Sequence, residues 1–319
     1  MSDPVRLAVI GAGIMGTNHA RVANSLPSID LVAVVDTDRA RAAAAAAASG
    51  ARVATAVDEV LGDIEAAVIA VPTRFHLETA QQLMDAGVHV LVEKPLARDT
   101  EEATRLVEAS EAAGVILAVG HIERFNAAVA ELPRLLEDPI HIEASRISPY
   151  SARVADGVIF DLMIHDLDVV SALAGEGAEP VDVSGIARAV KGDTEDLASV
   201  TIRFSTGLTA TINTSRLGQQ KIRLLEITQA ESMVVADLVR QDITVHRMSR
   251  HEYLSDEGTR YRQSSVIEIP FLETRGEPLA LELLHFVDCI RTGTSPRVDG
   301  RAGVRAIRLA EMARAAVGF

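Results

Sequence analysis

The glycine-rich hexapeptide GAGIMG, at Gly11–Gly16, is the feature of this 319-residue sequence that most restricts its fold. It follows the apolar, β-branched run Val5–Ile10 and precedes a helical pattern over Met15–Leu26. The spacing G-x-G-x-x-G between a strand and a helix is typical of the first turn of a doubly wound α/β domain. Glycine-rich turns also occur for purely structural reasons, so the motif needs support from the sequence around it.

That support comes from the alternation of strands and helices over the first third of the chain. Short apolar runs alternate with helical stretches of ten to fifteen residues, which predicts βαβ units and a parallel sheet covered on both faces. We therefore expect an N-terminal Rossmann domain, a doubly wound parallel sheet, over residues 1–122. The further expected strands are Leu31–Val35, Ala66–Val71, Val88–Val92 and Val115–Val119, and the further helices are 38–48, Leu77–Ala86 and Thr100–Ala113.

The pattern changes after residue 122. Strand-like runs dominate 180–269, and Ser205-Thr206-Gly207 between two of them indicates a hairpin. Antiparallel strands with helices to one side predict an α+β domain over 123–319, its closing helix being free to pack back on the first domain. Helices are expected at Ala127–Leu136, Val158–Leu173, 278–291 and 301–316, and strands at Ile140–Ser148, Val181–Val190, Leu197–Phe204, Leu208–Ser215, Arg223–Gln229, Met233–Asp237 and Ile243–Arg247.

Composition excludes several classes of protein. Hydrophobic residues make up 48% of the chain, which is too many for a disordered protein. The net charge of −14 opposes binding to nucleic acid. The single Cys289 rules out an internal disulfide framework and a cysteine-rich zinc site. With neither a signal-peptide pattern nor an apolar stretch of membrane-spanning length, we expect a cytoplasmic protein.

Asp36 gives the glycine motif a more definite meaning. It follows Gly16 by twenty residues at the end of the second expected strand, where a carboxylate binds the ribose hydroxyls of a dinucleotide. Such a carboxylate repels a 2′-phosphate and favours NAD over NADP, although Arg39 and Arg41 lie nearby. The residues expected to bind the cofactor here are Gly11, Ala12, Gly13, Ile14, Met15 and Asp36.

Polar residues follow three of the expected strands, in the segments VPTRFH at 71–76, VEKP at 92–95 and GHIERFN at 120–126. Ligands of an open parallel sheet bind beyond the carboxyl ends of its strands. For Lys94 alone, the need of a charged side chain for solvent explains its place just after a buried strand as well as a functional role does. Three such segments together favour a binding site.

In the second domain, Asp161 and His165 are spaced i and i+4, so on a helix they share one face. A carboxylate beside an imidazole orients it and stabilises its protonated form, which suits a proton acceptor. The spacing is also compatible with an ordinary surface pair, or with a metal site that includes Asp168. No other His/Asp cluster at ligand spacing supports a metal, and we expect none.

These residues together resemble the Gfo/Idh/MocA oxidoreductases, which include glucose–fructose oxidoreductase and inositol dehydrogenases. The resemblance covers essentially the whole chain through GAGIMGTNHAR, VPTRFH, EKPL and DLMIHDLD. It implies a Rossmann domain followed by a domain with a large, mostly antiparallel sheet that commonly mediates dimers or tetramers. It also implies that Lys94, Asp161 and His165 are catalytic, with His165 as the base, although Lys94 and His165 could titrate as a coupled pair. The residues that would line the nicotinamide half of the cofactor are Val71, Pro72, Thr73, His76, Glu93 and Lys94.

The segment GHIERFN is similar to a narrower group, the UDP-N-acetylglucosamine 3-dehydrogenases and related nucleotide-sugar enzymes, except that Ala127 stands where that group usually has proline. Arginine suits the recognition of a diphosphate, so Arg124 or Arg153 could hold a nucleotide sugar. Ordinary inter-domain salt bridges would explain these two residues equally well. The alternatives are an inositol or free-sugar dehydrogenase and a non-catalytic NAD-binding sensor. The expected substrate-binding residues are Lys94, Arg124, Asn126, Tyr150, Arg153 and His165.

Overall fold

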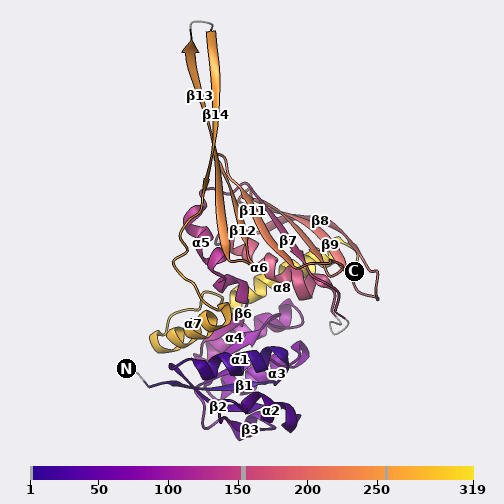
Figure 1. Ribbon diagram of the computed structural model, residues 1–319. Coiled ribbons are helices and arrows are strands. Elements are labelled where there is room, and N and C mark those ends of the chain that lie inside the picture. Colours follow the sequence, from indigo (N-terminus) through magenta and orange to yellow (C-terminus); the bar gives the residue numbers. More distant parts are fainter. Residues whose placement is uncertain (1–2, 152–155, 256–257) are drawn as a thin grey trace. The chain divides into compact units, whose positions relative to one another are not determined.

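The computed structural model describes residues 3–151, 156–255 and 258–319 and divides the chain into two compact units (Figure 1). The first unit comprises Met1–Phe125 and Gly276–Arg308, and the second comprises Asn126–Arg275 and Leu309–Phe319. Among the described residues, no helix has the length and apolar character needed to cross a membrane.

A six-stranded parallel sheet forms the centre of the first unit. Its order is β3-β2-β1-β4-β5-β6, the arrangement of a doubly wound dinucleotide-binding fold, as predicted. The three-residue edge strand β3 was not expected, because a run this short carries no apolar period of its own. The strands are β1 (Val5–Ile10), β2 (Ile29–Val35), β3 (Arg52–Ala54), β4 (Ala66–Ile69), β5 (His89–Glu93) and β6 (Leu117–Gly120).

Helices from both ends of the sequence cover this sheet. Leu283, Phe286 and Val287 of helix α7 are buried in the same core as Leu7 and Leu91 of the strands. A segment near the C-terminus therefore completes the core of the N-terminal unit. The helices here are α1 (Ile14–Ser25), α2 (Arg39–Ala46), α3 (His76–Asp85), α4 (Thr100–Ala113), α7 (Pro278–Thr292) and the first part of α8 (Gly300–Ala316), with the short 3-10 turns η1 (Val57–Glu59), η2 (Thr73–Phe75) and η3 (Ile122–Phe125).

The second unit contains an eight-stranded sheet of order β14-β13-β12-β11-β7-β10-β9-β8. Every neighbouring pair is antiparallel except β7 and β10, so the sheet is mostly antiparallel, as expected. The strands are β7 (His141–Ile147), β8 (Pro180–Arg188), β9 (Leu197–Phe204), β10 (Thr209–Ser215), β11 (Ile222–Thr228), β12 (Ser232–Asp237), β13 (Asp242–Ser255) and β14 (Gly258–Glu268).

Two of these strands differ from the prediction. β13 is much longer than the expected run Ile243–Arg247, and β14 was not expected at all. Together they extend as a two-stranded ribbon beyond the neighbouring strands (Figure 1). The sequence of this ribbon is mostly polar and lacks the apolar alternation by which a half-buried strand is recognised.

One face of the large sheet packs against helices. Along β10 every second side chain is buried, including Ala210 and Ile212. The buried ion pair between Arg146 of β7 and Asp166 of α6 has both N–O distances at 2.8 Å and ties that helix to the sheet. The helical elements of this unit are α5 (Ala127–Leu135), the π-helical turn η4 (Ile159–Met163) and α6 (Ile164–Leu173).

Candidate active site

The three glycines of the first turn have different surroundings. A Cβ atom on Gly11, whose φ is +97°, would lie 2.6 Å from the carbonyl oxygen of Ala70. A Cβ on Gly16 would lie 1.7 Å from the carbonyl oxygen of Gly11, whereas a Cβ on Gly13 would meet nothing within 4 Å. The outer two glycines therefore let backbone pack on backbone. Gly13 leaves an open approach to the start of α1, which has no side-chain cap.

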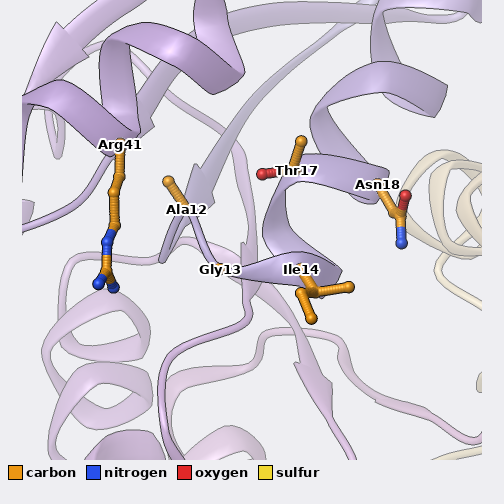
Figure 2. A pocket seen from close by; sticks show the side chains of 6 residues that line it. All are labelled: Ala12, Gly13, Ile14, Thr17, Asn18 and Arg41. Atoms are coloured by element: carbon orange, nitrogen blue, oxygen red, sulfur yellow. The ribbon is translucent and has the colours of Figure 1, made fainter. Parts of the chain in front are cut away.

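The carboxylate of Asp36, at the end of β2, is aimed back at this turn. Its Oδ2 accepts the N–H of Ala12 at 2.7 Å, and its Oδ1 accepts the N–H of Asp38 at 2.8 Å. Each oxygen keeps a second lone pair, which suits the ribose hydroxyls of a dinucleotide. Beside it lies an open pocket (Figure 2), so the acceptor oxygens and the space both fit NAD. The pocket is lined by Ala12, Gly13, Ile14, Thr17, Asn18 and Arg41.

Lys94 follows directly on a buried carboxylate at the end of β5. Glu93 is 7% exposed, and its Oε1 lies 2.8 Å from Nε2 of His19 on α1. Burial opposes ionisation of Glu93, but the hydrogen bond from His19 and the charges of His19 and Lys94 outweigh it, so the pKa of Glu93 is lowered. The backbone N–H of Lys94 donates to Oε2 of Glu93 at 3.2 Å, which fixes the chain where the half-buried Lys94 side chain begins.

His76, at the start of α3, connects two of the predicted cofactor segments. Its Nε2 lies 2.9 Å from the carbonyl oxygen of Val71, and its Nδ1 lies 3.0 Å from that of Pro95. Burial lowers the pKa of His76, although the hydrogen bonds to these carbonyl oxygens act in the opposite direction. The segments carrying Val71 and Lys94 are thus joined by one side chain. Nearby, Pro72 is exposed and Thr73 is half-buried.

Asp161 and His165 lie on one continuous helical stretch, as the spacing predicted, and both are half-buried. The stretch is not uniform, because its first turn, Ile159–Met163, is π-helical and only Ile164–Leu173 is α-helical. π-helical turns are rare and recur at functional sites. Asp161 belongs to the π turn and His165 to the first turn of α6. Lys94 belongs to the other unit.

The predicted substrate residues have different surroundings in the structure. Asn126 is 3% exposed, and its amide donates to the carbonyl of Leu238 and accepts the N–H of Ala128, which makes it the cap of α5. Tyr150 is 46% exposed. Arg124 is half-buried, and its carbonyl accepts a hydrogen bond from Arg297. Arg153 lies outside the described residues.

Two features of these surroundings were not foreseen. His19 and Glu93 are separated by 74 positions, so no local pattern reveals their contact. A buried pair, Asp196 and Arg216, lies near the start of η4, again far apart in sequence.

Asp168, considered above as a metal ligand, is 2% exposed. Within the described ranges, no three His, Cys, Asp or Glu residues form a group that could hold a metal ion.

Comparison with known proteins identifies the family. A model of an oxidoreductase family with an NAD-binding Rossmann fold matches residues 5–121, and the model of the Gfo/Idh/MocA C-terminal domain matches residues 134–233. The sequence is 32% identical to UDP-N-acetylglucosamine 3-dehydrogenase of Acidithiobacillus ferrooxidans, over 98% of this chain and 97% of that protein. The chain belongs to the Gfo/Idh/MocA oxidoreductase family. It is an NAD-dependent dehydrogenase that acts on hydroxyl groups.

Other members of the Gfo/Idh/MocA family share this organisation. The scyllo-inositol 2-dehydrogenase (NAD(+)) of Bacillus subtilis is 32% identical over 93% of this chain and 90% of that protein. The solved structure of the Acidithiobacillus enzyme, GnnA, superimposes with a TM-score of 0.88 at 33% identity, covering 98% of this chain and 97% of that one. GenD2 from gentamicin A biosynthesis, in complex with NAD, gives a TM-score of 0.81 at 25% identity, with 99% and 95% covered.

Proposed function

We propose that this protein oxidises a secondary hydroxyl of a nucleotide sugar, of the type UDP-N-acetylglucosamine, by transferring its hydride to NAD. The observation that carries the proposal is the end-to-end likeness to the Acidithiobacillus enzyme, which spans 98% of this chain and 97% of that protein. The segment GHIERFN at 120–126 supports the same assignment. In this proposal the first unit binds the cofactor and contributes Lys94 and Arg124, and the second provides the other substrate residues.

The chemistry needs a proton acceptor and a group that stabilises an alkoxide. We assign the acceptor role to His165, oriented by Asp161, and the stabilising role to Lys94 as a cation. The hydroxyl proton passes to His165 while the carbinol C–H breaks and its electron pair leaves as hydride. Bound NAD supplies the carbon that takes this hydride, so the products are a ketone, NADH and one proton.

A diphosphate needs cationic partners, and the second unit offers a group of them near Tyr150. The side-chain nitrogen of Lys191 lies 6.0 Å from the Tyr150 ring centre, and the guanidinium carbon of Arg216 lies 5.9 Å from it. Lys191 is exposed, whereas Arg216 is held by Asp196. This supports Tyr150 as a substrate-binding residue. Arg124 and Arg153 are proposed for the same ligand.

A substrate panel tests the proposed reaction. Purified protein with NAD is offered UDP-N-acetylglucosamine, myo-inositol, scyllo-inositol and glucose, and NADH formation is followed by absorbance. We expect turnover with the nucleotide sugar and a 3-keto product by NMR. Turnover only with an inositol would establish the main alternative, which the Bacillus relative favours. Tight NAD binding without turnover of any of the four would overturn the proposal in favour of a sensor.

Replacement of the proposed catalytic residues tests their roles. Lys94→Met and His165→Ala should each lower kcat by about 100-fold or more, because the first removes the cation that stabilises the alkoxide and the second removes the proton acceptor. NAD affinity, measured by fluorescence titration, should be unchanged. Lys221→Met and His246→Ala remove the same residue types from the large sheet unit and serve as matched controls. Near-normal turnover in both Lys94→Met and His165→Ala would refute the assignment.

We also propose that the protein is a homodimer or homotetramer. The face of the eight-stranded sheet opposite the buried side chains carries the exposed apolar side chains of Ile186 and Met233. Light scattering coupled to size exclusion measures the assembly directly. A monomer at micromolar concentration would contradict this part of the proposal.

A further inference from the structure

The helical stretch that carries Asp161 starts against a buried carboxylate from a distant part of the chain. Glu195, just before β9, is 3% exposed. Its Oε1 accepts the N–H of Ile159 at 3.1 Å, and its backbone carbonyl accepts the N–H of Val158 at 3.0 Å. No side chain of the stretch itself caps this end. Glu195 therefore holds the first two N–H groups of the stretch.

Gly157 makes this contact possible. A Cβ atom at position 157 would lie 2.1 Å from each carboxylate oxygen of Glu195, so only glycine allows the carboxylate to lie there. The carbonyl of Gly157 in turn accepts the N–H of Asp161 at 3.1 Å. The contact between Glu195 and Gly157 is thus one hydrogen bond away from the backbone of Asp161.

Both sides of this contact are anchored by a second buried group. Arg216 pairs with Asp196, whose side chain is fully buried, and its Nη2 donates to Oγ1 of Thr194 at 3.0 Å. The Nη1 of Arg216 donates to the carbonyl of Asp156 at 2.8 Å, immediately before Gly157. Burial of Asp196 is outweighed by hydrogen bonds from the Lys191 N–H and Arg216, so the pKa of Asp196 is lowered and the pair stays charged. One guanidinium therefore ties together the two segments that meet at Gly157.

We propose that Glu195 is a positioning residue: it sets where the π-helical turn η4 begins, and through that turn it orients Asp161 and His165. The inference rests on the catalytic roles proposed above for those two residues. A π turn closes i to i+5 hydrogen bonds, so a change in where it starts shifts the register of every side chain that follows. Displacements of about 1 Å at reacting groups cost on the order of 100-fold in rate.

Replacement of Glu195 distinguishes positioning from simple stability. Glu195→Gln keeps an oxygen acceptor of the same length for the Ile159 N–H, so it should retain most of the activity. Glu195→Ala removes the acceptor and should lower kcat by about 10- to 100-fold, with KM for NAD unchanged. Glu131→Ala is the matched control, because Glu131 is 6% exposed in the same unit and pairs with Arg134 on its own helix, α5. It should lower Tm and leave kcat unchanged.

A spectroscopic readout separates this inference from the proposed function. The ring signal of His165, assigned by its loss in His165→Ala, should move in Glu195→Ala and stay in place in Glu195→Gln, while the His246 signal stays in place in both. If the ring signal moves but His165→Ala retains full turnover, the positioning stands and the catalytic role fails. If the ring signal and kcat of folded Glu195→Ala both match the parent protein, the positioning role is overturned.

The pair of positions 157 and 195 provides a test that does not depend on Glu195→Ala being fully stable. Gly157→Ala forces a methyl group onto the carboxylate, so kcat should fall by at least about 10-fold and Tm should fall as well. In the double variant Gly157→Ala/Glu195→Ala, the methyl group has room. The effect of Gly157→Ala should therefore be smaller in that background, a coupling typical of residues in contact. Additive effects of the two substitutions on kcat would contradict the proposal.

Discussion

Asp36 illustrates how a single side chain can shape its own binding site. Its carboxylate accepts the N–H of Ala12 at 2.7 Å, so the residue that we propose binds the ribose also holds the glycine turn in place. The same carboxylate accepts the N–H of Asp38, the residue that caps the N-terminus of α2. Cofactor choice and the geometry of the turn are therefore linked at this residue.

This link predicts different results for two substitutions of Asp36. Asp36→Asn keeps an oxygen for the Ala12 N–H but removes the charge, so kcat/KM for NADP relative to NAD should rise. Asp36→Ala loses the acceptor too, and its kcat/KM for NAD should fall by about 10-fold or more, the size expected for a hydrogen bond to a charged group. Asp30→Asn, exposed on the same strand, should change neither value. An unchanged NADP to NAD ratio in both Asp36 variants would contradict this interpretation.

The residues proposed for the candidate site were chosen from the sequence because their signals are local. Asp36, Lys94, Asp161 and His165 stand at fixed distances from a glycine turn, a strand end or one another. His19 and Glu195 could not be predicted in the same way. Each acts through a partner tens of positions away, and a contact of that kind depends on how the strands are ordered in space, which no period in the sequence encodes.

At the scale of elements, the turn between β1 and α1 combines two tasks at different glycines. Gly16 lies so close to the backbone of Gly11 that no side chain fits, whereas Gly13 faces open space. The first position serves the packing of helix on strand, and we propose that the second serves the approach of the cofactor. The two tasks can therefore be separated by substitution.

Gly16→Ala should destabilise the protein severely, because its Cβ would lie 1.7 Å from a carbonyl oxygen. Gly13→Ala should fold, with Tm lowered by no more than about 4 °C, the scale of a solvent-facing substitution. Its NAD affinity should nevertheless fall by at least about 10-fold, because the added methyl group meets the pyrophosphate. Thermal melts and NAD titrations measure both. Gly13→Ala with unchanged NAD affinity would place the cofactor elsewhere.

The elements that could be predicted were those with a strong period of their own. The parallel strands are continuous apolar runs, and the α-helices lie where the helical pattern and good helix formers indicated. β3 was missed because three residues carry no period. β14 was missed because a ribbon outside the body of a sheet has no need of alternating apolar side chains. The π turn was missed because a one-residue change in hydrogen bonding leaves the helical pattern almost intact.

At the scale of the whole molecule, stability depends on pH through a buried carboxyl group. Glu282 of α7 is 2% exposed, and in the described part of the chain no group donates a hydrogen bond to either of its carboxylate oxygens. Burial, together with the negative charge of Glu93, raises the pKa of Glu282 well above 4.5. The folded protein therefore keeps a proton that the unfolded chain releases near its ordinary pKa.

The sign of the resulting pH dependence follows. The stability associated with protonated Glu282 is fully present below pH 4.5 and is lost as the pH rises towards its folded pKa. Glu282→Gln cannot ionise, so its Tm relative to the parent should increase steadily from pH 5 to pH 8, as measured by scanning calorimetry.

Glu102→Gln is the contrasting control. Hydrogen bonds from Arg98 lower the pKa of Glu102, so its contribution is present above the ordinary pKa of 4.5 and is lost only as the pH falls below it. Its Tm difference from the parent should therefore stay constant from pH 5 to pH 8. A flat difference for Glu282→Gln over that range would show that Glu282 ionises normally.

The division of the first unit into two stretches of sequence affects its synthesis. Helix α7 covers part of the core that the first 125 residues begin, yet all of 126–275 must be translated before it. At about 5–20 residues per second, that interval lasts roughly 8 to 30 s. During this time the nascent N-terminal sheet leaves the ribosome with the apolar surface for Leu283, Phe286 and Val287 still bare. Chaperones that bind apolar surface can bind the sheet during this interval. A gene fragment that stops at residue 125 would leave that surface bare permanently.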